Sequence, residues 1–272
     1  MSHSPNSTNT TVTDIIASQS RWGAFLVDAS GVLYNESGII PGAQAAWKAL
    51  NTAAPTFMVT NNTCDSPEEI ADRLSGVGFE ILAEQIISSG FGLANDHPTR
   101  ELLVDQRVYW VGYPGAKDSY LAGTGAISVD SIESASRVVI GSSIPGMAGI
   151  LDQIELSQLP VICCNPDLYI RGIGESRFPV AGYYAKILED RGIPIHWIGK
   201  PLPNFSAVVK TLIEQKGASL HSGACFFDDN PNNVLAMQSH LDISGCWIQQ
   251  TGIFFDSDPN QWAPTFGIQS FR

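Results

Sequence analysis

The sequence predicts an α/β fold, a doubly wound parallel sheet with helices on both of its faces. Short apolar runs alternate with helical stretches along most of the 272 residues, and polar residues follow directly after several of these runs. Repeated β-then-α units imply parallel strands joined by right-handed crossovers. In such sheets the chemistry gathers at the carboxyl ends of the strands. We therefore expect the functional residues where the apolar runs end.

The first part of this pattern contains three strands and two helices. We expect strands at 23–28, Thr56–Thr60 and 86–89, and a helix around 44–50. A second helix begins at Pro67, because Ser66 and Glu69 form a capping box and proline suits the first helical position. It ends near the glycines at 76 and 78. These elements alternate as a parallel sheet requires.

A separate unit interrupts the pattern between residues 91 and 180. It contains expected strands at 107–112, 137–141 and 159–164 and a helix at 147–156. The first pattern then resumes with helices at 183–191, 204–216 and after Pro231, and with strands at 194–199, 224–229 and 245–250. We predict a flexible N-terminal tail (1–20), a core domain (21–90 and 181–272) and an inserted α/β domain (91–180).

The composition excludes several classes of partner. A formal net charge of −12 argues against nucleic acid and anionic membranes, which attract clustered Lys and Arg. An acidic chain that binds phosphate needs help from a cation. No apolar run approaches the roughly 18 residues of a membrane span, and no secretion signal follows Met1, so we expect a cytoplasmic protein. The five cysteines lack CxxC spacing, which argues against a zinc site.

Four expected strand ends carry polar groups that would suit a single site. They are Asp28, Thr60 with Asn61 and Asn62, Lys200, and Asp228 with Asp229. Phosphoryl transfer needs such parts: a nucleophile, donors for the equatorial oxygens, and a cation held by acids. Each residue also has an ordinary structural explanation, as a turn or helix cap or as a solvated lysine. Their order and placement together favour the functional interpretation.

These segments resemble a known family. "DASGVL", "VTNN", "IGKPLP" and "FFDDNPNNV" are similar to the four motifs of the haloacid dehalogenase superfamily of hydrolases. The "TNN" after the second strand and "CNPDLY" upstream of the lysine resemble class IIA of that superfamily, which includes para-nitrophenyl phosphatases and sugar and nucleotide phosphatases. The similarity covers residues 22–250. It implies a Rossmann-like core with an inserted cap domain.

The resemblance also implies roles for individual residues. Asp28 would be the nucleophile that forms an aspartyl-phosphate, and Lys200 would neutralise charge on the nucleophile and the phosphate. Thr60 would hydrogen-bond the phosphoryl oxygens, with Asn61 and Asn62 as further substrate-binding residues.

A magnesium site follows from the same resemblance. Asp28, Asp228 and the backbone carbonyl of Ser30 would hold Mg²⁺, and Asp229 would orient water at the metal. An all-oxygen site of this kind suits Mg²⁺. Residues 91–180 would form the cap that closes over a small phosphorylated metabolite and selects it. A role of this segment in homodimer contacts is an alternative, and the "NPD" at 165–167 would lie at the seam without a catalytic role.

Ser30 departs from the family pattern. Phosphatases of this superfamily carry a second Asp there, which protonates the leaving oxygen and then activates water. A serine hydroxyl cannot hold a transferable proton in this way, and the loss of such a group costs about 10²–10⁴ in rate. Ser30 remains a candidate substrate-binding residue, and its backbone carbonyl remains a candidate ligand of the metal.

Three readings of the site therefore stay open. The protein is a slow Mg²⁺-dependent phosphatase, a hydrolase of the dehalogenase or phosphonatase kind, or a ligand-binding or partner-binding descendant with little turnover. Retention of Asp28, Thr60, Lys200 and Asp228 favours turnover. Dehalogenases and phosphonatases place their cap directly after the first motif, whereas the insert here follows the third strand. We favour the phosphatase.

Overall fold

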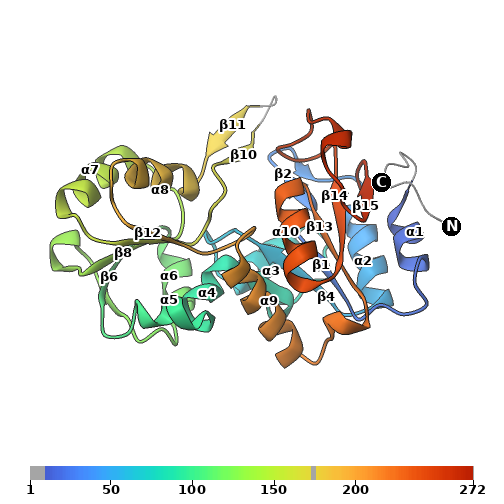
Figure 1. Ribbon diagram of the computed structural model, residues 1–272, viewed down its shortest axis with the longest axis horizontal. Coiled ribbons are helices and arrows are strands. Elements are labelled where there is room, and N and C mark those ends of the chain that lie inside the picture. Colours follow the sequence, from blue (N-terminus) through green and yellow to red (C-terminus); the bar gives the residue numbers. More distant parts are fainter. Residues whose placement is uncertain (1–9, 173–175, 272) are drawn as a thin grey trace.

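The computed structural model describes residues 10–172 and 176–271. Figure 1 shows two lobes, each built around its own sheet and covered by helices. Every strand pairing within the six-stranded and the five-stranded sheet is parallel. The predicted α/β fold with parallel sheets is confirmed.

The six-stranded sheet has the order β15-β14-β13-β1-β4-β5. Its strands are β1 (Ala24–Val27), β4 (Thr56–Thr60), β5 (Ile86–Ser88), β13 (Ala224–Asp228), β14 (Ser244–Ile248) and β15 (Phe266–Ile268). Every residue of β1, β4 and β13 is buried. Apart from Thr56 and Thr60 of β4 and Asp228 of β13 their residues are apolar, because helices cover both faces of the sheet.

Helices pack on the two faces of this sheet. On one face lie α1 (Val12–Ala17), α2 (Ala43–Ala53) and α3 (Pro67–Ser75), and on the other lie α9 (Pro203–Gln215) and α10 (Pro231–Leu241). Alternate side chains of β1 serve the two faces: Phe25 joins the first layer of core and Leu26 the second. The predicted capping box of α3 is present, with Ser66 accepting from the Glu69 N–H.

The N-terminal prediction needs correction. We predicted a flexible tail over 1–20, but residues 12–17 form α1. Val12 and Ile15 are buried in the same core as α2, so the apolar residues of this short segment are anchored. Residues 1–9 lie outside the described part of the chain.

The five-stranded sheet has the order β12-β9-β8-β6-β7. Its strands are β6 (Arg107–Val111), β7 (Ile127–Val129), β8 (Arg137–Ile140), β9 (Val161–Cys163) and β12 (Ile195–Trp197). Around it lie α4 (Gly92–Asn95), α5 (His97–Glu101), α6 (Pro114–Leu121), α7 (Met147–Ser157) and α8 (Ala181–Asp190). Val108 and Ile162 share a core layer with Phe205 of α9, so the two lobes are packed together.

One strand lies in a different sheet from the one expected. We assigned the strand at 194–199 to the core, but β12 pairs with β9, with Ile195 opposite Val161. An apolar run predicts a strand without identifying its partner, because pairing is decided by long-range packing. The chain therefore returns to the first lobe after β12, and α8 packs in the second lobe against α7.

Two short antiparallel hairpins complete the structure. They are β2 (Tyr34–Asn35) with β3 (Gly38–Ile39), and β10 (Tyr169–Arg171) with β11 (Arg177–Pro179). Figure 1 shows β10 and β11 above the junction of the two lobes. The short 3₁₀ helices are η1 (Ala83–Gln85), η2 (Ser89–Phe91), η3 (Ile132–Ser134), η5 (Leu220–Ser222) and η6 (Pro259–Gln261).

The helices are too short or too polar to cross a bilayer, a statement that covers residues 10–172 and 176–271.

Candidate active site

The two central strands of the six-stranded sheet deliver acids to the same edge. Asp28 follows β1 directly, and Asp228 is the last residue of β13. The strands are parallel neighbours, with Val27 opposite Phe227, and the Asp28 N–H donates to the Phe227 carbonyl at 2.8 Å. This register brings both carboxylates out at the carboxyl end of the sheet, where the sequence analysis expected them.

Lys200 lies between these two carboxylates. Its Nζ is 2.7 Å from Oδ1 of Asp28 and 2.7 Å from Oδ2 of Asp228. The lysine is only 1 % exposed. Burial by itself lowers the pKa of Lys200, but Asp228 and Asp28 outweigh it and the net shift is upward. The ammonium group is therefore a fixed positive charge beside the Asp28 carboxylate.

Asp228 is held at the start of α10, and its neighbour Asp229 is held by the segment that follows β14. The Asn230 N–H donates to Oδ1 of Asp228 at 2.8 Å, and Nδ2 of Asn233 lies 3.3 Å from both Asp228 oxygens. Asp229 accepts the Ile253 N–H at Oδ2 (2.8 Å). Side chain and backbone contacts therefore fix the orientation of both acids.

Gly31 allows the turn after β1 to lie against Asp229. It has φ of +80°, and a Cβ at this position would come within 2.6 Å of the Asp229 carboxyl carbon. A larger residue would be strained in this backbone conformation and would displace the acid. This close approach explains why glycine follows Ser30 in the sequence.

The site contains more negative than positive charge. Ligand atoms of Asp28, Asp228 and Asp229 lie within 4.8 Å of one another, against the single charge of Lys200. Burial raises the pKa of Asp28 to about 7 although Lys200 opposes it. Burial and the charges of Asp228 and Asp28 raise the pKa of Asp229 well above its ordinary value. Three oxygen donors with uncompensated charge have the chemistry to hold a divalent cation.

The last residue of β4 and the residues that follow it have hydrogen-bond partners within the protein. The Thr60 hydroxyl accepts the Asn62 N–H at 3.1 Å. Asn61 accepts the Lys200 N–H at Oδ1 (2.8 Å), and its Nδ2 donates to the Lys200 carbonyl and to Oδ2 of Asp167, both at 3.0 Å. Asn61 therefore connects the lysine to a loop of the second lobe. The contacts of Thr60 and Asn61 with a phosphoryl group stay a prediction.

Asn62 also has partners within the chain. Its Oδ1 accepts the Cys64 N–H at 2.8 Å, and its main-chain carbonyl accepts the Ser88 hydroxyl at 2.6 Å. These bonds shape the loop after β4. Substrate contact by Asn62 stays a prediction as well.

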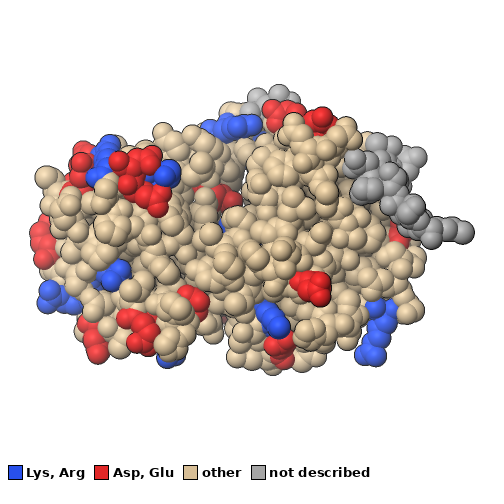
Figure 2. All heavy atoms as spheres, viewed as in Figure 1, with Lys and Arg blue, Asp and Glu red and all other residues tan. Residues whose placement is uncertain are grey.

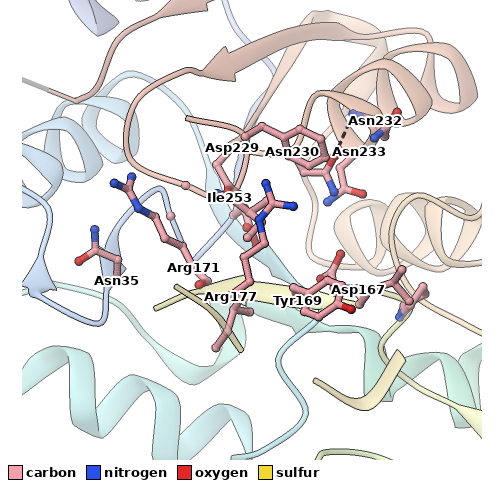
Figure 3. Close-up of a pocket in the computed structure, with 18 of the residues that line it drawn as sticks. Asn35, Asp167, Tyr169, Arg171, Arg177, Asp229, Asn230, Asn232, Asn233 and Ile253 are labelled. Atoms are coloured by element: carbon pink, nitrogen blue, oxygen red, sulfur yellow. Dashed lines mark hydrogen bonds between the residues drawn. The ribbon is translucent and has the colours of Figure 1, made fainter. Parts of the chain in front are cut away.

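A cavity of about 500 Å³ opens above the acids, between the lobes. Asp28, Ser30 and Asp229 line it from the six-stranded lobe, and Asp167, Arg171 and Arg177 line it from the segment that follows β9. Figure 2 shows the surface hollowed between the lobes, and Figure 3 shows the side chains around this cavity. A small molecule in the cavity would contact both lobes.

Sequence reasoning missed three of these residues as candidates. Asp167 was placed at the seam without a role, yet burial raises its pKa to about 6 although Lys200 and Asn61 oppose this. Arg171 and Arg177 were not considered, because the hairpin that carries them was not predicted. The available signal was a pair of arginines close together in an acidic chain.

Comparison with known proteins gives a family match. A family model described as haloacid dehalogenase-like hydrolase matches residues 25–125. The chain is 30% identical over 187 residues to a dihydroxyacetone phosphatase of Corynebacterium glutamicum, a stretch of 66% of this chain and 65% of that protein. It is 39% identical over 89 residues to haloacid dehalogenase-like hydrolase domain-containing protein 2 of Rattus norvegicus, covering 31% and 34%. The chain thus spans about two thirds of the first relative and one third of the second.

Solved structures share the fold of nearly the whole chain. A possible sugar phosphatase of Cytophaga hutchinsonii superposes with a TM-score of 0.79 at 19% identity, over 96% of this chain and 97% of the other. A thermostable NPPase of Geobacillus stearothermophilus gives a TM-score of 0.74 at 22% identity, over 92% and 97%. At these identities the likeness shows a common fold, including the arrangement of two lobes.

Proposed function

The chain belongs to the haloacid dehalogenase-like hydrolases, and from this premise we propose that it is a Mg²⁺-dependent phosphatase of small phosphorylated metabolites. The resemblance to class IIA noted in the sequence agrees with this family and with the shared fold. The observation that supports the activity most is the contact of Lys200 with Asp28 and Asp228 beneath an open cavity. A buried lysine between two strand-end acids suits phosphoryl transfer better than structural support alone.

In the proposed reaction Asp28 attacks the phosphorus atom. A bond forms between its carboxylate oxygen and phosphorus, while the bond from phosphorus to the alcohol oxygen breaks and the alcohol leaves with a proton. Water then attacks the aspartyl-phosphate, which restores the Asp28 carboxylate and releases inorganic phosphate. Lys200 offsets the negative charge that Asp28 and the phosphoryl oxygens bring together.

The cation site belongs to the same proposal. Asp28, Asp228 and the Ser30 carbonyl are the groups that would hold Mg²⁺. The family resemblance gave Asp229 the role of orienting water at the metal, but its ligand atom lies within 4.8 Å of those of Asp28 and Asp228, so we propose it as a further ligand. When bound, the ion would offset the charge of the acids and of the phosphoryl group. The preference for Mg²⁺ over other divalent ions is part of the proposal.

Asp167 is our candidate for the proton role that Ser30 cannot fill. It lines the cavity together with Asp28 and Ser30, and its pKa of about 6 lies near the working pH of an acid–base group. It would donate a proton to the leaving oxygen. Its hydrogen bond with Asn61 supports this by fixing the carboxylate relative to Lys200.

The substrate class rests on the cavity and on the named relatives. The relatives include a dihydroxyacetone phosphatase and an acid sugar phosphatase of Staphylococcus saprophyticus, the latter 29% identical over 123 residues. We propose that the six-stranded lobe is the catalytic core and the five-stranded lobe a cap that selects a phosphorylated metabolite of this size. The cavity between them has the volume of a small-ligand site.

The test is hydrolysis of para-nitrophenyl phosphate with and without Mg²⁺. We expect slow turnover that requires the ion and falls to background in Asp28→Asn. Asp130→Asn is the matched control, since Asp130 is exposed and outside the cavity lining. Unchanged hydrolysis in Asp28→Asn would remove this residue from the mechanism. Absence of turnover with every phosphate ester tested, despite binding of Mg²⁺, would favour the ligand-binding descendant.

A further inference from the structure

Two arginines face each other on the hairpin beside the cavity. Arg171 of β10 and Arg177 of β11 are register partners in the antiparallel pair. Side chains of directly opposite residues lie on the same face of a hairpin, where like charges repel and destabilise the pair. This chain has only 15 Lys and Arg against 27 Asp and Glu. Two positive charges placed opposite each other in this way favour the binding of an anion between them.

The arginines face the cavity that holds Asp28. Both belong to its lining, and Figure 3 shows their side chains rising from the hairpin into it. Asp28 and Asp229 line the cavity from the six-stranded lobe, and the arginine pair lines it from β10 and β11. A bound molecule would therefore meet the acids from one lobe and the arginines from the other.

Arg171 is already positioned. Its guanidinium stacks on the Phe255 ring, 4.0 Å from the centroid, and its Nη1 donates to the Gln250 carbonyl at 3.0 Å. A guanidinium carries five N–H donors, so this bond leaves others for a ligand. The stacking and the hydrogen bond reduce the entropy that Arg171 would lose when it binds an anion.

Arg177 is held less firmly. Its Nη2 lies 3.9 Å from Oδ1 of Asp256, and both side chains are more than half exposed, at 54% and 59%. An exposed ion pair of this length contributes little to stability. Arg177 can exchange this partner for an anionic ligand at small cost, and the two guanidinium groups can then bind one carboxylate or phosphate together.

We infer that Arg171 and Arg177 form a subsite for a second anionic group, so that the substrate is a small phosphate ester with a carboxylate or a second phosphate. This inference rests on the proposed function and narrows its substrate class. The phosphoryl group that reacts lies at Asp28, and the second anion lies at the arginine pair. Phosphate esters whose leaving alcohol carries no negative charge have the lower kcat/KM.

The experiment compares pairs of phosphate esters that differ in whether the alcohol part carries a second anionic group. The first pair is 3-phosphoglycerate and glycerol 3-phosphate, and the second is fructose 1,6-bisphosphate and fructose 6-phosphate. We expect kcat/KM to be at least tenfold higher for the doubly anionic member of one pair, which also identifies the anion as carboxylate or phosphate. Arg171→Gln and Arg177→Gln each reduce this selectivity ratio by about tenfold, as the loss of one charge-assisted hydrogen bond predicts.

The matched control is Arg107→Gln. Arg107 is exposed at the start of β6 and is not part of the cavity lining, so its substitution retains the selectivity ratio. Equal kcat/KM within both pairs for the wild-type protein would overturn the inference. An equal fall for both members of a pair in the arginine variants would do the same, because it would indicate a merely structural hairpin.

Binding separates this inference from the proposed function. Calorimetric titration of Asp28→Asn with 3-phosphoglycerate and glycerol 3-phosphate, and with the two fructose phosphates, measures recognition without turnover. Tighter binding of a doubly anionic ester that is lost in the Arg177→Gln background supports the subsite even if the wild-type protein hydrolyses nothing. Turnover of many esters with no preference within either pair retains the phosphatase and rejects the subsite.

Discussion

Asn61 binds the main chain of Lys200 on both sides. It accepts the Lys200 N–H at Oδ1 and donates from Nδ2 to the Lys200 carbonyl, at 2.8 and 3.0 Å, although the residues are 139 positions apart. The same Nδ2 reaches Asp167 of the other lobe. One buried amide therefore sets the position of the lysine that contacts Asp28 and links that position to the cavity wall.

We predict that Asn61→Ala destabilises the protein by about 2–4 kcal/mol, because three hydrogen bonds are lost and buried groups of Lys200 are left without partners. Turnover should fall more than tenfold even in the fraction that is folded, since Lys200 loses its fixed position. Urea unfolding measures the first effect and kcat with para-nitrophenyl phosphate the second. Asn95→Ala, at an exposed asparagine, serves as the control. A stability loss equal to that of the control would contradict the role of Asn61.

The acid cluster predicts stabilisation by a divalent cation. Asp28, Asp228 and Asp229 repel one another in the absence of an ion, and binding to the folded state alone raises the free energy of unfolding. At a Mg²⁺ concentration of 100 Kd the gain is about 2.7 kcal/mol. Thermal unfolding with Mg²⁺ and with EDTA measures it, without any need for turnover.

Asp229→Asn should reduce the stabilisation by Mg²⁺, because one charged ligand is lost. It should also raise the stability measured in EDTA, because the repulsion with Asp228 and Asp28 is relieved. The opposite signs of the two effects distinguish a cation site from general damage to the fold. A melting temperature that Mg²⁺ leaves unchanged in the wild-type protein would contradict the site.

Ser30 offers a gain-of-function test. We predict that Ser30→Asp increases turnover of alkyl phosphates by at least tenfold, toward the factor of about 10²–10⁴ that a positioned acid–base group supplies. Ser30→Asn has nearly the same size as the aspartate and no transferable proton, so it should show no gain. The measurement is kcat for glycerol 3-phosphate beside that for para-nitrophenyl phosphate. An equal increase in both variants would point to shape instead of proton transfer.

Much of the fold could be predicted because its strands are buried on both faces. The run at Thr56–Thr60 and the cap at Ser66 were located correctly from the residues alone. Local patterns do not identify the sheet that a strand joins, and β12 was for this reason assigned to the wrong one. The hairpin of β10 and β11 was missed because its strands are short and mostly exposed, so they show no apolar run.

In the candidate site, too, some positions follow from local sequence patterns and others from long-range packing. Asp28 and Asp228 could be predicted because each follows or ends a strand of one parallel sheet, and such residues meet at one edge. Lys200 was expected beside them and contacts both, although the strand before it, β12, belongs to the other sheet. Asp167 and Arg177 come from the segment after β9 in the other lobe. Their position depends on how two lobes pack, which the spacing along the chain does not encode.

Asp167 predicts a pH dependence of stability. Burial raises its pKa to about 6 from the ordinary 3.8, so the folded state holds the proton more tightly than the unfolded chain. Its stabilising contribution is complete below about pH 4, decreases as the pH rises to about 6, and is absent above that value. This difference between the folded and unfolded pKa corresponds to roughly 3 kcal/mol. The Asp167→Asn side chain cannot titrate but can still accept the hydrogen bond from Asn61. The free energy of unfolding of this variant, relative to the wild-type protein, should therefore rise by up to that amount between pH 4 and 7.

Urea unfolding in EDTA at both pH values measures the difference, and Asp130→Asn, at an exposed acid, should show little change. Parallel pH curves for Asp167→Asn and the wild-type protein would mean that folding does not raise the pKa of Asp167, and Asp167 would then lack the proton that the leaving oxygen requires.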